Sequence, residues 1–248
     1  MKLLLDIGNT AVKWAFAGGR TLAGQGGFVH RDGNFRELAD RAWSTATAPE
    51  AVFAVNVAGA GLASALSEYL QAAWRLEPEF VQVSAADCGV TNAYSTPGDL
   101  GADRWVAMIA AHRLSDGAVC VVDCGTAVTV DVVTAAGRHR GGLILPGVTM
   151  LCRSLQVNTA GIGLQDDVPA SGILALGTRA GVEHGARILL VSAIERIVSE
   201  LAEQGGEMPD VILTGGDAEQ LLPLLGITVQ HVPGLVLQGL AIMSEGRS

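Results

Sequence analysis

The chain has 248 residues, of which 49% are hydrophobic, and a formal net charge of −9. This length suits one large α/β domain or two small ones, and an acidic chain without a Lys/Arg cluster argues against a nucleic-acid partner. No apolar run approaches the about 20 residues that cross a bilayer, and the first run ends at Asp6, too early for a signal peptide. We therefore expect a cytoplasmic protein that binds neither nucleic acid nor membranes.

The first half of the chain predicts three strands followed by alternating helices and strands. Residues 3–7 form a short apolar run broken by Gly8 and Asn9, which predicts a strand and a tight turn. Two further apolar runs complete an antiparallel meander. The strands of this meander are predicted at 3–7, 11–17 and 21–29, later strands at 51–57 and 80–83, and helices at 34–43, 61–74 and 100–114.

The second half repeats this order. Strands are predicted at 119–126, 128–133, 138–145 and 210–214, and helices from 146 to 155, from 177 to 204 and after Pro233. A strand that runs through Asp and Gly into Thr occurs at residues 6–10 and again at 123–127. This repetition indicates an internal duplication. We expect an α/β fold of two halves, residues 1–116 and 117–248, each with one such turn.

The turn after the first strand has the residues of a phosphate-binding loop. Gly8 permits close approach of a ligand, and the backbone N–H groups with the Thr10 hydroxyl can face phosphate oxygens. Lys13 can reach the same phosphates as a point charge. Asp6 supplies an oxygen for Mg²⁺ or for its waters. An ordinary hairpin with a solvated Asp is the alternative.

The second turn has the same design. Asp123 can bind a cation and Thr126 can donate to a phosphate, so two such turns on opposite sides of a cleft would hold a triphosphate. A structural role for the acid Asp131 stays open. The glycine turns at residues 141–147 and 214–217 carry no assigned role.

A third set of residues opens the helix predicted at 100–114. Asp103 lies among the unpaired N–H groups of a first helical turn, where it is either a structural cap or a base that deprotonates an alcohol. Arg104 next to it can pair with an anionic group of a substrate. Phosphoryl transfer depends mostly on positioning and charge, so one well-placed carboxylate suffices.

Four segments together resemble the type III pantothenate kinases, within the superfamily of acetate kinase, sugar kinases, Hsp70 and actin. They are Asp6-Ile7-Gly8-Asn9-Thr10-x-x-Lys13, Tyr94-x-x-Pro97-x-x-Leu100-Gly101-x-Asp103-Arg104, Asp123-x-Gly125-Thr126-Ala127-x-Thr129-x-Asp131 and Gly141-Gly142-x-Ile144-x-Pro146-Gly147. The four occur in the order of the family and span most of the chain.

The resemblance implies an internally duplicated two-domain actin-like (ribonuclease H-like) ATPase fold. It also implies a homodimeric enzyme that phosphorylates pantothenate to 4′-phosphopantothenate with ATP, the first step of coenzyme A biosynthesis. Mg²⁺ and a monovalent cation, K⁺ or NH₄⁺, would be needed. The substrate, the monovalent cation and the dimer come from the resemblance alone, because spacing indicates none of them.

The resemblance also implies roles for single residues. Asp103 would be the catalytic base, Asp123 would bind the monovalent cation, and Asp6 would bind Mg²⁺, directly or through water. ATP would be bound by Asp6, Ile7, Gly8, Asn9, Thr10, Ala11, Val12, Lys13 and Thr126, and pantothenate by Tyr94, Gly101, Ala102, Asp103, Arg104 and Thr178. The segment before Thr178, residues 161–175, departs from the form of the family.

Two other functions stay open. One is a kinase or phosphatase of the same superfamily that acts on a sugar, a polyphosphate or another small alcohol. The two Asp-x-Gly turns would serve it equally, and only residues 94–104 argue against it. The other is a nucleotide-binding accessory factor for transcription, which would not need Asp103. The presence of Asp103 and the acidic charge of the chain both argue against that role.

Overall fold

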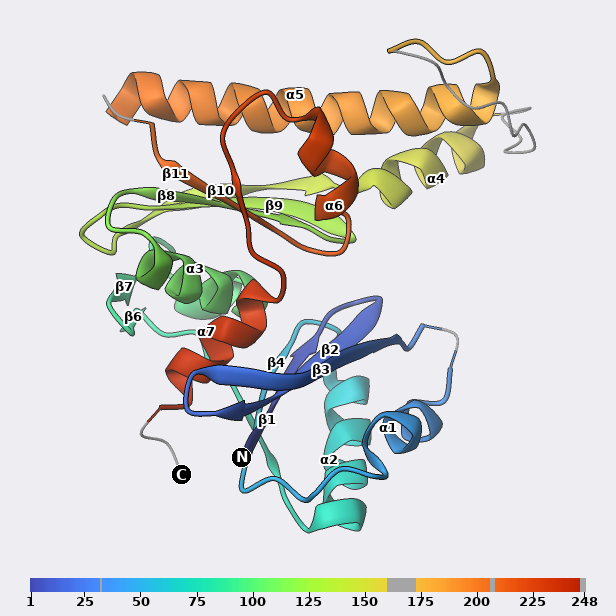
Figure 1. The fold of residues 1–248 in the computed structure, drawn as a ribbon, viewed down its shortest axis with the longest axis vertical. Coiled ribbons are helices and arrows are strands. Elements are labelled where there is room, and N and C mark those ends of the chain that lie inside the picture. Colours follow the sequence, from blue (N-terminus) through green and yellow to red (C-terminus); the bar gives the residue numbers. More distant parts are fainter. Residues whose placement is uncertain (32, 160–172, 206–207, 246–248) are drawn as a thin grey trace. The chain divides into compact units, whose positions relative to one another are not determined.

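The computed structural model describes residues 1–31, 33–159, 173–205 and 208–245. Two five-stranded mixed sheets dominate it (Figure 1), and their strand orders are equivalent: β3-β2-β1-β4-β5 and β10-β9-β8-β11-β12. In both sheets, the first strand of the three-strand meander is central. The repeated topology confirms the predicted α/β fold with an internal duplication.

The strands of the first sheet are β1 (Lys2–Ile7), β2 (Ala11–Gly18), β3 (Thr21–Val29), β4 (Val52–Asn56) and β5 (Pro78–Phe80). Those of the second are β8 (Val119–Cys124), β9 (Ala127–Val133), β10 (His139–Pro146), β11 (Asp210–Thr214) and β12 (Gln230–His231). A small hairpin pairs β6 (Ala86–Asp87) with β7 (Val90–Thr91). The strand predicted at 80–83 lies slightly earlier, although the Val81 N–H still donates to the Ala54 carbonyl (2.8 Å).

The helices are α1 (Phe35–Trp43), α2 (Ala60–Trp74), α3 (Ala102–Leu114), α4 (Val148–Asn158), α5 (Thr178–Gly205), α6 (Ala218–Leu221) and α7 (Leu235–Met243), with short 3-10 turns at Pro97–Asp99 and Leu222–Leu224. Asn34 caps the start of α1, because its side chain accepts the Arg36 N–H. Among the described residues, no helix is both long and apolar enough to span a membrane.

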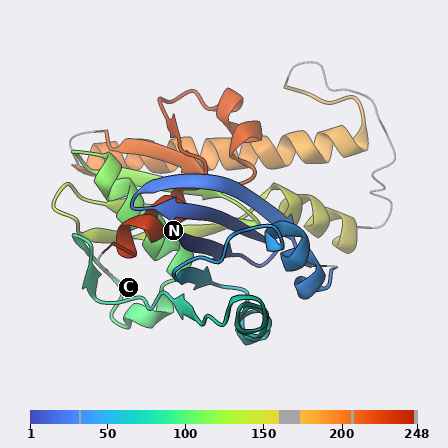
Figure 2. The same cartoon turned by 60° about the horizontal axis from the view of Figure 1, so that its bottom comes forward.

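The chain forms two compact units, and the first contains residues 1–116, 133–141 and 234–248. One face of its sheet packs on α1 and α2 through Leu3, Leu5, Ile7 and the aromatic residues around Trp43. Figure 2 shows α2, in teal, nearly along its axis. The opposite face of the sheet contacts α7, which packs on α3.

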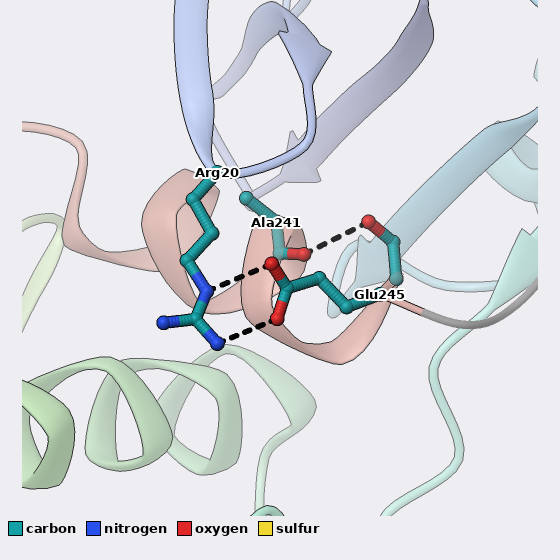
Figure 3. Close-up of polar contacts among 4 residues, drawn as sticks. Arg20, Ala241 and Glu245 are labelled. Atoms are coloured by element: carbon teal, nitrogen blue, oxygen red, sulfur yellow. Dashed lines mark hydrogen bonds and ion pairs between the residues drawn. The ribbon is translucent and has the colours of Figure 1, made fainter.

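The last helix, α7, lies in a different unit from the one that the predicted division at residue 116 assigned to it. Residues 117–248 were expected to form one half, yet α7 packs with the first unit. Gly239 is the point of closest approach, since a Cβ there would lie 2.1 Å from the Val106 carbonyl oxygen of α3. The carboxylate of Glu245, just after α7, accepts both hydrogen bonds of the Arg20 guanidinium (2.8 and 2.6 Å), which fastens the end of α7 to the turn between β2 and β3 (Figure 3).

The second unit contains residues 117–132 and 142–233. Its core lies between one face of the second sheet and the helices α4, α5 and α6, with Val122, Leu190 and Leu213 among its fully buried side chains. Figure 1 shows α5, in orange, running along that face of the sheet. The turns at the carboxyl ends of the strands lie at the edge where α/β sheets bind ligands.

Candidate functional site

The first predicted phosphate loop is a tight turn between the two central antiparallel strands of the first sheet. Asp6 lies directly opposite Lys13 in the β1–β2 register, so both side chains lie on the same face of the sheet. The turn closes with a hydrogen bond from the Gly8 N–H to the Ala11 carbonyl (3.0 Å). Asn9 at its tip is exposed to solvent. A carboxylate, an ammonium group and a glycine turn therefore meet at one edge of this sheet.

His30 binds two carbonyl groups of this loop, a role that the sequence did not indicate. Its backbone N–H donates to the Thr10 carbonyl (3.1 Å), and its Nε2 lies 2.8 Å from the Gly8 carbonyl oxygen. Because a carbonyl oxygen only accepts, Nε2 must carry the proton in this contact. No spacing in the sequence indicated the contact, since residues 8 and 30 are brought together only by the pairing of β2 with β3.

The predicted base, Asp103, lies in the first turn of α3. Its Oδ1 accepts the Arg104 backbone N–H (2.8 Å), so the carboxylate folds back over the start of the helix. A Cβ at Gly101 would lie 2.6 Å from the same Oδ1. The glycine therefore leaves room for this position of the carboxylate, and a methyl group there would displace it.

Tyr94 contacts both a cation and an imidazole. The Arg104 guanidinium lies 5.9 Å from the centroid of the Tyr94 ring, and its NH1 donates to the Tyr94 hydroxyl (3.3 Å). The second neighbour is His139, whose ring is stacked on the Tyr94 ring with the centroids 6.0 Å apart and an interplanar angle of 10°. Arg104 and His139 are both buried. The predicted substrate residues Tyr94 and Arg104 thus form one packed group, to which His139 adds a third member.

The backbone around this group is fastened by residues 133–141. The Thr91 N–H donates to the Gly137 carbonyl (2.8 Å), and the Ala93 N–H donates to His139 Nδ1 (3.4 Å). Gly137 has a φ of +74° and its Cα lies so close to Gly89 that a Cβ would be 1.9 Å from the Gly89 carbonyl oxygen. Only glycine is compatible with both conditions.

A cavity of about 510 Å³ lies next to the start of α3. It occupies the carboxyl ends of the parallel strands β4 and β5 and is lined in part by Asn56, Phe80, Gln82, Leu100, Gly101 and Ala102. A volume of this size accommodates a small organic molecule. Backbone amide groups, side-chain amides and apolar carbon all line it, so its chemistry suits a ligand of mixed polarity.

The second predicted phosphate loop has the same construction in the second unit. The Gly125 N–H donates to the Ala127 carbonyl (3.1 Å), and the Gly147 N–H donates to the Thr126 carbonyl (3.1 Å). A Cβ at Gly147 would lie 2.4 Å from the Gly125 carbonyl oxygen, so the start of α4 packs directly on this turn. Thr126 is exposed and Asp123 is half-buried.

The turn after β11 completes the surroundings of Asp123. Gly215 has a φ of +97°, and a Cβ there would lie 2.4 Å from the Cys124 carbonyl and 2.5 Å from Asp123 Oδ1. The Asp217 N–H donates to the Cys124 carbonyl (2.8 Å). Burial, together with the charges of the nearby carboxylates of Asp123 and Asp217, raises the pKa of the Cys124 thiol to about 12.

Burial also raises the pKa of Asp217, although hydrogen bonding from Gln220 and the charge of Arg187 oppose that shift. The charges of Asp123 and Asp217 both act on the Cys124 thiol, so both carboxylates lie near the end of β8. The turn at 214–217 carried no role from its sequence, and its proximity to Asp123 follows from the parallel pairing of β11 with β8.

The predicted substrate residue Thr178 is the first residue of α5. It is exposed at the start of α5, and the departing segment before it, residues 161–175, lies mostly outside the described residues. In the parts of the chain that the structure describes, no group of three or more His, Cys, Asp or Glu residues has the geometry of a metal site.

Solved structures with the same fold define the class of this protein. A protein from Campylobacter jejuni assigned to the Baf family of transcriptional activators matches with a TM-score of 0.58 and 20% identity, covering 98% of this chain and 97% of that one. A protein from Sinorhizobium meliloti assigned as a 2-dehydro-3-deoxygalactonokinase matches with a TM-score of 0.55 and 14% identity, covering 99% and 98% of the two chains. The fold is that of the actin-like kinases and ATPases, as predicted.

The sequence itself narrows this class to one family. The family model for type III pantothenate kinase matches residues 2–200. A type III pantothenate kinase from Nitrosococcus oceani is 39% identical over 100% of this chain and 95% of its own length. The chain belongs to the type III pantothenate kinase family, which confirms the resemblance carried by the four motifs.

Proposed function

We propose that this protein transfers the γ-phosphoryl group of ATP to the primary hydroxyl of pantothenate, which yields 4′-phosphopantothenate in the first step of coenzyme A biosynthesis. The observation that carries the proposal is membership of the type III pantothenate kinase family along the whole chain. The packed group around Tyr94, the carboxylate of Asp103 and the cavity beside α3 support it. Together they offer a cation, a carboxylate and a space of about 510 Å³ in one unit.

In this proposal Asp103 is the catalytic base. Its carboxylate accepts the proton of the substrate hydroxyl as the oxygen attacks phosphorus. The Arg104 N–H that binds Oδ1 fixes the orientation of the carboxylate (2.8 Å). The Arg104 side chain supplies the positive charge for the carboxylate of pantothenate, and Tyr94, Gly101 and Ala102 line the acceptor site. Thr178 joins that site in the proposal as well.

The two glycine turns bind the phosphates of ATP. In the first, residues 6–13 offer backbone N–H groups, the Thr10 hydroxyl and the Lys13 ammonium group. In the second, Thr126 offers a hydroxyl. These donors contribute charge stabilisation and positioning, which account for most of the catalysis in phosphoryl transfer.

Mg²⁺ and a monovalent cation fit the oxygen donors of the two turns. Mg²⁺ in such sites takes one or two carboxylates, with phosphates and waters as the remaining ligands, and Asp6 suits this role. When bound, it would neutralise charge on the phosphates. Asp123 would hold K⁺ or NH₄⁺, and its half-buried carboxylate beside the second glycine turn suits a cation.

We also propose that the protein is a homodimer and works in the cytoplasm. Exposed apolar side chains gather on the edge strand β10 and on the packed helices α4 and α5, including Leu143, Ile144, Met150, Leu155 and Leu189. A second copy would cover such a surface. The four cysteines are free thiols, as suits a reducing compartment. The proposal includes no nucleic-acid or membrane partner.

A coupled ADP-release assay tests the reaction. Pantothenate-dependent turnover with ATP and Mg²⁺ is expected in potassium or ammonium buffer and not in sodium buffer. Asp123→Asn should lose this dependence on the cation. Turnover with other small alcohols but not with pantothenate would refute the substrate.

Light scattering tests the assembly. The wild-type protein should have the mass of two chains, and Leu189→Asp should shift it to one chain. A wild-type protein with the mass of a single chain would refute the dimer.

A further inference from the structure

Two carbonyl oxygens of the first phosphate loop, those of Gly8 and Thr10, are both bound by one residue. His30 follows the last residue of β3, and its backbone N–H extends the β2–β3 pairing by one hydrogen bond, to Thr10 (3.1 Å). Its ring then reaches the Gly8 carbonyl through Nε2 (2.8 Å). The two bonds join the loop to β3 at either side of Asn9.

Because the peptide bond is planar, these contacts fix the orientation of the Gly8–Asn9 peptide unit. In a trans peptide unit the C=O and the following N–H point in opposite directions. Since the Gly8 oxygen is held toward the His30 ring, the N–H of Asn9 in the same peptide unit points away from that ring. Asn9 is the exposed residue at the tip of the loop, so this N–H is available to an approaching anion.

We infer that His30 is a positioning residue for ATP, which acts by fixing the Gly8–Asn9 peptide so that the Asn9 N–H faces a phosphate group. The inference rests on the proposed function, because it assumes that this turn binds phosphate. His30 itself does not touch the nucleotide. Without the His30 ring, the Gly8–Asn9 peptide can rotate. ATP binding must then order this peptide itself, which lowers the affinity for ATP.

Two substitutions of similar length separate the hydrogen bond from the bulk of the side chain. His30→Gln keeps an N–H donor near the position of Nε2, whereas His30→Met fills the space without a donor. Val29→Ala is the matched control, since Val29 is an exposed neighbour at the end of the same strand. The ATP dissociation constant is measured by calorimetry without pantothenate, and KM for each substrate is measured in the coupled assay.

His30→Met should raise the dissociation constant and the KM for ATP by about 3- to 10-fold, the range for one lost hydrogen bond. The KM for pantothenate at saturating ATP should stay unchanged. His30→Gln should recover most of the loss, and Val29→Ala should behave as the wild type. A merely structural role would lower thermal stability and affect both substrates equally in all His30 variants.

Three results are decisive against the inference. Wild-type ATP affinity in His30→Met overturns it while leaving the proposed function intact. Equal losses in His30→Gln and His30→Met overturn it as well, because the donor would then be irrelevant. If the wild-type protein binds no ATP at all, the proposed function fails and the inference fails with it.

Discussion

The stacked pair of Tyr94 and His139 makes a quantitative prediction for the variant His139→Ala. The substitution removes a buried imidazole whose ring is stacked on Tyr94 and whose Nδ1 accepts the Ala93 N–H. An aromatic pair contributes about 0.5–1.5 kcal/mol beyond its buried area. An N–H left without its acceptor costs about 1–3 kcal/mol, and the long contact of 3.4 Å favours the lower end.

Together these effects destabilise the segment that carries Tyr94 by about 2 kcal/mol. If pantothenate binding has to restore the order of that segment, the KM for pantothenate rises by up to about 30-fold. The KM for ATP should change by less than about twofold, because the stack and the Ala93 hydrogen bond order the segment that carries Tyr94. Steady-state kinetics with each substrate varied in turn, in potassium buffer, measures both constants.

Two further variants divide the effect into its parts. His139→Phe keeps the ring and loses the acceptor, whereas His139→Gln keeps an acceptor and loses the ring. Each should show an intermediate rise in the KM for pantothenate. The reasoning would be refuted if His139→Ala kept the wild-type KM for pantothenate while Tyr94→Ala raised it strongly. An equal rise in both KM values would indicate a general loss of structure instead.

Three other predictions concern the base, a glycine and the buried thiols. Asp103→Asn should keep the fold and ATP affinity but lower kcat by about 100-fold or more, and near-wild-type turnover would remove Asp103 from the role of base. Gly215→Ala should lower the free energy of unfolding by about 1–3 kcal/mol in urea titrations, since a methyl group at φ +97° would overlap the Cys124 carbonyl; an unchanged midpoint would contradict that contact. Burial raises the pKa of Cys120 and of Cys124 to about 12 each. Because the unfolded thiols ionise at lower pH, stability should be constant below about pH 8 and fall as pH rises from about 9 toward 12, and Cys120→Ala with Cys124→Ala should flatten that fall if the thiols cause it.

The packing of α7 shows where prediction from the sequence ended. A helix after Pro233 was predicted, and α7 confirms it. Seven of its nine residues are buried, so no single apolar face indicates which sheet it covers. The choice depends on Gly239, which allows close contact with Val106 of α3. Complementarity between two helix surfaces is not encoded in the periodicity of either one.

The sequence by itself determined the duplicated strand-turn-strand units, the candidate phosphate turns at Asp6 and Asp123, the helix that begins beside Asp103, and the family. These features depend on residues close together in the chain, where alternation, glycine and capping patterns report local backbone preferences directly. Only the tertiary structure decided that His30 holds Gly8, that His139 stacks on Tyr94, and that Gly215 packs against Asp123. Each of these pairs is distant in sequence and meets through strand pairing or core packing, so no local pattern could have indicated it.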